Sequence, residues 1–166
     1  RLISSNSPEI KPYEKVDGYN LYISFSARER KAKLIRNMSQ AKIGGITIDA
    51  LKASFTTDRI QGGKAVVPSN IVSAYVNAIT MFEKIILQIF TTDESIKLVF
   101  GEDQEGNPEF FFNADIIDPS APNLIKYDRK LLVFHRLGNI KLFDGEIKNS
   151  DTEELQRKFS ELEKIF

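Results

Sequence analysis

The chain has 166 residues, of which 42% are hydrophobic, 28% are charged and none is cysteine. This length and composition suit one folded domain with its own core, and they exclude disulfides, thiolate metal sites and cysteine nucleophiles. The formal charge is zero, but residues 1–83 hold 12 basic and 7 acidic side chains, so the two halves carry charges of +5 and −5. Such a division of charge suggests a basic face on the molecule, unless the two halves of the chain intermingle in the folded structure.

The first half of the chain predicts a linker, a strand and a helix. Residues 1–18 show neither helical nor strand periodicity and are expected to be a lead-in. Residues 19–26 alternate apolar and polar side chains, which indicates a strand. Ser26 and Glu29 form a capping box, and apolar residues recur at helical spacing up to two glycines, so the pattern predicts a basic helix over 27–42.

The middle of the chain contains the longest apolar pattern. Residues 46–61 fit either a strand pair or a short helix, and the alternation of Ile46 and Ile48 favours the strand pair. Residues 69–90 predict a core helix with Ser69 as N-cap, because polar side chains form only one narrow stripe. A membrane helix is disfavoured because four polar or charged side chains would lie in hydrocarbon. The expected buried positions are Val72, Tyr75, Ile79, Phe82, Ile86 and Phe90.

The second half predicts an antiparallel meander and a closing helix. Residues 95–101 and 108–117 suggest a hairpin, and short extended runs follow at 124–127, 131–135 and 140–144. Ser150 and Glu153 form a second capping box, and apolar residues at helical spacing predict an amphipathic helix over 151–166. The fold class is therefore α+β, with five to eight mainly antiparallel strands packed on a buried central helix.

Basic side chains gather in the predicted first helix and provide the main hint of function. Phosphate contacts need cations more than exact geometry, so this helix is a candidate surface for nucleic acid or for an acidic protein. A solvated basic helix without a partner is the plainer interpretation of the same pattern. The candidate binding residues are Arg28, Arg30, Lys31, Lys33, Arg36 and Lys42.

A Glu-x-Lys triplet near the C-terminus raises the alternative of a nuclease of the PD-(D/E)xK type. There, two carboxylates hold Mg²⁺ and a lysine positions water. Asp128, Glu146 and Lys148 are the residues that could fill these roles, with Asp144 as a substitute carboxylate. The same triplet also occurs at Glu9 to Lys11 in the predicted linker, and Asp144-Gly145 has the composition of a turn. The triplet therefore favours a hairpin over an active site.

Other motifs lead to no site. His135 is the only histidine, and no serine or carboxylate is tied to it by sequence, so a solvated side chain is expected. The glycine pair at 62–63 departs from the phosphate-loop pattern, and the acidic run at 102–109 departs from the EF-hand pattern. No metal and no cofactor are expected.

The sequence therefore predicts a non-catalytic binding or assembly module that contacts nucleic acid or an acidic partner. Alternatives are the metal-dependent nuclease and a protein-interaction domain that docks through the helix at 151–166. The missing initiator methionine leads us to expect a piece of a longer protein. With no secretory signal in the sequence, a cytoplasmic location is the default expectation.

Overall fold

A computed structural model of the chain describes residues 2–4, 18–60, 67–121, 129–150 and 152–166. The strands in this part of the chain are β1 (Leu2–Ser4), β2 (Tyr19–Ser26), β3 (Lys31–Ile35), β4 (Phe110–Ile117), β5 (Leu131–Phe134), β6 (Ile140–Phe143) and β7 (Glu146–Ser150). The helices are α1 (Met38–Lys42), α2 (Ile48–Ile60), α3 (Ser69–Thr92), the 3₁₀ turn η1 (Glu94–Ile96), α4 (Lys97–Phe100) and α5 (Glu153–Ile165).

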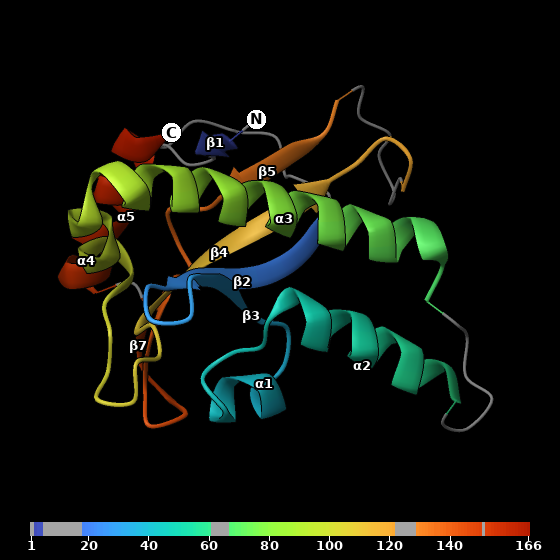
Figure 1. The fold of residues 1–166 in the computed structure, drawn as a ribbon, viewed down its shortest axis with the longest axis horizontal. Helices are drawn as coiled ribbons and strands as arrows, with labels where there is room; N and C mark the ends of the chain where they lie inside the picture. The colour runs from blue at the N-terminus through green and yellow to red at the C-terminus, as the bar shows by residue number, and fades with distance from the viewer. Residues whose placement is uncertain (1, 5–17, 61–66, 122–128, 151) are drawn as a thin grey trace.

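The strands form one sheet, in which β1, β5, β4, β2 and β3 follow each other in that order. The pairs between β2, β3, β4 and β5 are antiparallel, whereas β1 pairs in parallel with β5. Strand β6 pairs with the start of β4 and with β7, so the β6–β7 hairpin extends the sheet from β4. The expected α+β class with a mainly antiparallel sheet is confirmed (Figure 1).

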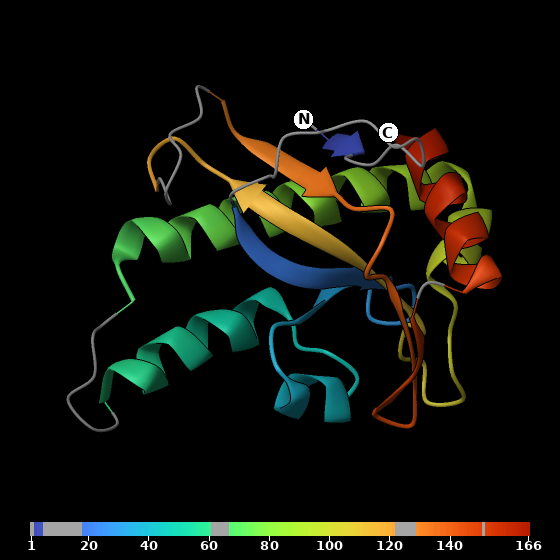
Figure 2. The ribbon, with the colours of Figure 1, turned by 180° about the vertical axis from the view of Figure 1, so that it is seen from behind.

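Helix α3 is the central helix of the fold and covers one face of the sheet, behind the strands in the view of Figure 2. Five of the six expected core positions are buried, and Val72 is half-buried. The helix starts after Pro68 without a side-chain cap, so the expected N-cap role of Ser69 is wrong. None of the helices in the described part of the chain has the length and apolar character that a membrane crossing needs.

The largest difference from expectation lies between residues 26 and 42. No long basic helix forms there, because β2 turns back into β3 and only the short α1 follows. One contact of the expected capping box does form, because the Glu29 amide donates to Ser26 Oγ at 3.1 Å. Here, however, it stabilises the turn between β2 and β3 and not the start of a helix. Ala32 and Leu34 lie fully buried under α3, and this burial favours the strand over the helix.

Two further segments form helices where strands were expected. Residues 46–61 contain α2, whose Leu51 and Phe55 are four residues apart and buried in the core. Residues 95–101 contain η1 and α4, and Ile96, Val99 and Phe100 bury one face at helical spacing. The expected hairpin between 95–101 and 108–117 is therefore wrong, although its second half is β4.

The C-terminal part follows the prediction more closely. Strands β5 and β6 lie in the expected runs, while the run at 124–127 lies outside the described residues. Helix α5 is confirmed, with Thr152 instead of Ser150 as N-cap. Leu155, Phe159 and Leu162 are buried in the core of this chain, and the alternative of docking through this helix stays a prediction.

Strand β3 lies at the edge of the sheet, and its outward amides already have acceptors. The Ala32 amide donates to Glu83 Oε2 at 2.8 Å, and the Leu34 amide donates to the Ile46 carbonyl at 2.8 Å. The amide of Arg36, just beyond the strand, donates to Gln40 Oε1 at 2.7 Å. This edge is therefore closed to the addition of another strand, and a partner would have to contact side chains.

Candidate functional site

The cations that the sequence assigned to a helix lie on the β2–β3 hairpin and beyond it. Arg28, Arg30 and Lys31 are exposed at the turn. The Arg28 guanidinium donates to the Glu105 carbonyl at 2.6 Å, and the Arg30 guanidinium lies 5.6 Å from the centre of the Phe90 ring. Both arginines are thus held in fixed places, while Lys31 extends into solvent.

Arg36 lies at the other end of β3. Its guanidinium stacks 4.7 Å from the Phe55 ring and 4.9 Å from the Tyr75 ring. Burial raises the pKa of the Tyr75 hydroxyl, and the nearby Arg36 charge opposes this shift only in part. Phe90 and Tyr75, the rings that Arg30 and Arg36 contact, are fifteen residues apart on α3, so the two contact points are about 22 Å apart along the helix axis.

The other two candidate residues, Lys33 and Lys42, are not part of this set of exposed cations near β3. Lys33 is buried and forms an ion pair with Glu29 at 3.0 Å, so its charge is neutralised within the hairpin. Lys42 is exposed on α1. We call Arg28, Arg30, Lys31 and Arg36 the edge cations, because they follow the edge strand from the hairpin turn to its far end.

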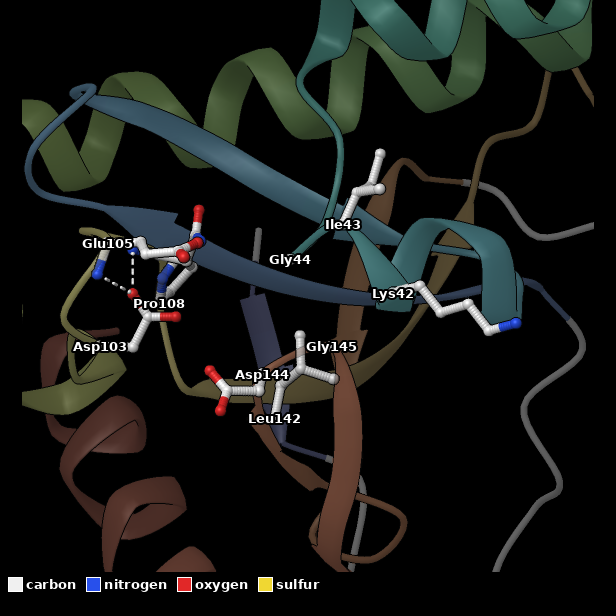
Figure 3. Close-up of a pocket in the computed structure, with 10 residues that line it drawn as sticks. Lys42, Ile43, Gly44, Asp103, Glu105, Pro108, Leu142, Asp144 and Gly145 are labelled. Atoms are coloured by element: carbon white, nitrogen blue, oxygen red, sulfur yellow. Dashed lines mark hydrogen bonds between the residues drawn. The ribbon is translucent and has the colours of Figure 1, made fainter.

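A polar pocket of about 300 Å³ lies beside the hairpin (Figure 3). Its walls come from the end of α1, the loop 101–109 and the β6–β7 turn. The lining residues are Lys42, Ile43, Gly44, Asp103, Glu105, Asn107, Pro108, Leu142, Asp144 and Gly145. Asp103 Oδ1 accepts hydrogen bonds from the backbone amides of Glu105 and Asn107, which fix the shape of the loop. We call this cavity the acidic pocket.

Charge in the acidic pocket is mainly negative. Asp103, Glu105 and Asp144 contribute carboxylates, whereas the Lys42 side chain extends away from them in Figure 3. Among the described residues, no group of three or more histidine or acidic side chains is placed to hold a metal ion. The pocket would repel phosphate, which leaves the edge cations as the anion-attracting part of this region.

The residues of the nuclease alternative are only partly described. Asp128 lies outside the described residues. Glu146 is exposed at the start of β7, and the backbone of Lys148 belongs to the same strand. Asp144 and Gly145 have φ angles of 49° and 73° and connect the paired Phe143 and Glu146, so this turn has the expected hairpin chemistry. The nuclease residues stay a prediction.

His135 has a carboxylate partner that sequence reasoning missed. Its Nε2 lies 3.2 Å from Asp115 Oδ2, and the amide of Asn20 donates to Asp115 Oδ1 at 2.9 Å. Antiparallel pairing of β2 with β4 places Asn20 opposite Asp115, although they are far apart in sequence. Burial would raise the pKa of Asp115, but the hydrogen bonds from His135 and Asn20 outweigh it and lower the pKa.

The lowered pKa of Asp115 predicts an acid-dependent contribution to stability. Its carboxylate stabilises the fold fully above the ordinary pKa of 3.8, and this contribution is lost as the pH falls through the lower folded value. We expect the difference in unfolding free energy between the wild type and Asp115→Asn, from urea titrations at several pH values, to shrink on acidification below about pH 4. Asn20→Ala removes one donor and should weaken this pH dependence. A difference that stays constant down to about pH 2 would contradict the assignment.

Comparisons with known proteins add no family to this description. The chain matches no protein-family model, no curated protein and no solved structure. The candidate site therefore depends on geometry alone. Within that geometry, sequence reasoning found the edge cations but missed Phe55, Tyr75 and Phe90, the rings that hold them. Helical spacing of Leu51 and Phe55 was the available signal for the first of these.

Proposed function

We propose that this protein is a non-catalytic binding module that contacts nucleic acid through the edge cations. The observation that carries the proposal is the set of three exposed arginines at the two ends of β3, each of which is held by a carbonyl or by aromatic rings. Side chains that are already ordered lose less conformational entropy when they bind. The spacing of about 22 Å between the contact points of Arg30 and Arg36 on α3 corresponds to roughly six base-pair steps of duplex DNA at 3.4 Å each.

Nucleic acid is favoured over an acidic protein because the edge cations lie at both ends of β3 instead of in one compact patch. Phosphates repeat along the whole length of a strand, so arginines at the two ends of β3 can contact several of them at once. The closed edge of β3 argues against peptide binding by strand addition. The acidic pocket beside the hairpin would keep the polyanion on the β3 side of the molecule.

The experiment is fluorescence anisotropy of labelled single-stranded and duplex oligonucleotides across a salt series, with EDTA present. If four phosphates are engaged, log K should fall with log salt with a slope of about −3.6 for duplex or about −2.8 for single strands. The combined variant Arg30→Gln, Lys31→Gln and Arg36→Gln should reduce the duplex slope to about −0.9. Circular dichroism and thermal unfolding should confirm that this variant is folded.

A matched control removes three exposed cations from other surfaces, by Lys97→Gln, Arg157→Gln and Lys164→Gln. This control should bind as the wild type does. Anisotropy that stays flat at low salt, or an equal loss in the control variant, would refute the proposal. Complete competition by polyglutamate at equal charge would instead assign the edge cations to an acidic protein.

A further inference from the structure

A second cavity lies along α3, and none of its lining residues is an edge cation. It has a volume of about 500 Å³ and runs between α3 and the β4–β5 part of the sheet. Its lining residues are Ala74, Asn77, Ala78, Thr80, Met81, Phe82, Lys84, Ile85, Ile116, Ile117, Asp118, Lys130, Leu131, Leu132 and Phe166. We call it the α3 groove. Its volume lies within the usual range of small-molecule sites.

The shape of the α3 groove follows from the sequence of α3. Ala74 and Ala78 are one helical turn apart and have small side chains, which leaves space above Ile116 and Leu132. From Ala74 to Ile85 the groove follows α3 for about 16 Å. Phe166 stacks on Phe82 at a ring-centre distance of 6.3 Å and lies at the Ile85 end. The cavity is therefore long, narrow and mostly apolar.

The charges of the α3 groove differ between its two ends. At the Ala74 end, Lys130 lies 4.0 Å from the buried carboxylate of Asp118, which offsets its charge. At the Ile85 end, Lys84 is exposed, and no described carboxylate lies within ion-pair distance of it. One end of an apolar channel thus presents a cation without a described anionic partner.

We propose that the α3 groove binds one unbranched long-chain carboxylate. The hydrocarbon chain would lie along α3 over Ala74 and Ala78, and the carboxylate would meet the Lys84 ammonium at the end closed by Phe166. A single narrow channel fits one chain, and a single lysine without an anionic partner among the described residues fits one negative charge. The residues of this site are separate from the edge cations, so the proposal stands independently of nucleic-acid binding.

The first test measures how affinity depends on chain length. Dansyl-labelled undecanoate is titrated onto the full chain by fluorescence and then displaced by hexanoate, octanoate, decanoate and dodecanoate. Each methylene buried in the groove should tighten binding by about fourfold, until the chain fills the available length and the gain stops. Affinity that does not depend on chain length would overturn the proposal.

The second test uses variants of the groove. Ala78→Phe fills the channel and should weaken dodecanoate binding by at least about tenfold, and Ala78→Leu serves the same purpose if the larger ring prevents folding. Lys84→Glu should weaken dodecanoate about tenfold but leave dodecanol unchanged, whereas Lys97→Glu on α4 should change neither. The proposal would be overturned if folded Ala78→Leu bound dodecanoate with wild-type affinity. It would also be overturned if Lys84→Glu and Lys97→Glu lost the same affinity for dodecanoate.

Discussion

Replacing Ile79 by alanine is expected to lower the free energy of unfolding by about 2 to 5 kcal/mol. Ile79 is fully buried in the middle of α3, where the helix crosses the sheet. Removing its branched side chain would leave a cavity between α3 and the strands, which rigid neighbours cannot fill. Urea unfolding followed by circular dichroism measures the change.

Thr80→Ala is the matched control, since Thr80 is the next residue of the same helix and is exposed. Its loss should stay within about 0.5 kcal/mol, because it removes no buried contact. A loss below about 0.5 kcal/mol for Ile79→Ala would contradict the central position of α3.

Gly145→Ala is expected to cost about 2 kcal/mol or more, although the residue lies in an exposed hairpin turn. Its φ angle of 73° is unfavourable for alanine. A Cβ atom would also overlap the Lys42 carbonyl oxygen, so the turn and α1 would have to separate. This separation would disturb the small core that Ala41 forms with Phe111 and Leu142. Thermal or urea unfolding of the variant measures the cost.

Gly44→Ala separates the two causes of this destabilisation. Gly44 has a similar φ angle of 80°, but the nearest neighbour of its added Cβ would be the Asn107 side chain, at 3.0 Å, and that side chain can move. Its cost should be about 1 to 2 kcal/mol from backbone strain alone. Equal losses in the two variants would show that the β6–β7 turn does not press against α1.

The elements that the sequence predicted well are those with long and consistent patterns. Strand β2 alternates over eight residues, and α3 and α5 repeat apolar side chains over several helical turns. In such segments local pattern and tertiary burial favour the same structure. The turn at Asp144 and Gly145 was also predictable, because both residue types tolerate positive φ.

The segment after β2 was mispredicted because its pattern fits two structures. Alternation of Ala32 and Leu34 with lysines suits a strand, while more widely spaced apolar residues suit a helix. Ser26 and Glu29 favoured the helix, but the contact that they form also occurs in a turn. Only the position of this segment beneath α3 favours the strand, and that position depends on residues more than forty positions away.

The predictions for residues 46–61 and 95–101, which form α2 and α4, were wrong for a related reason. Their apolar runs are rich in branched residues, and runs of this length are compatible with either structure when only periodicity is considered. The side chains that decided the outcome were Phe55 and Phe100, whose rings pack against Tyr75 and Phe82 of α3. These contacts are tertiary and leave little local signal.

The sequence predicted which residues belong to the candidate site, but it did not predict how they are arranged in space. Charge counting identified the edge cations, because clustered lysines and arginines are visible in any sequence. Their arrangement along a strand, the burial of Lys33 and the rings behind Arg30 and Arg36 required the fold. The pair of Asp115 and His135 also depends on strand register, which the sequence did not specify.

The occupied amides along β3 also affect how copies of this chain meet at high concentration. An edge strand with unpaired amides lets molecules join side by side into extended sheets, and many proteins aggregate by this route. Here Glu83 and Gln40 reach the backbone with their side chains, and Ile46 covers the position between them. The surface that gathers the arginines is thus also protected against polymerisation, so it can stay exposed for binding without becoming a seed for fibrils.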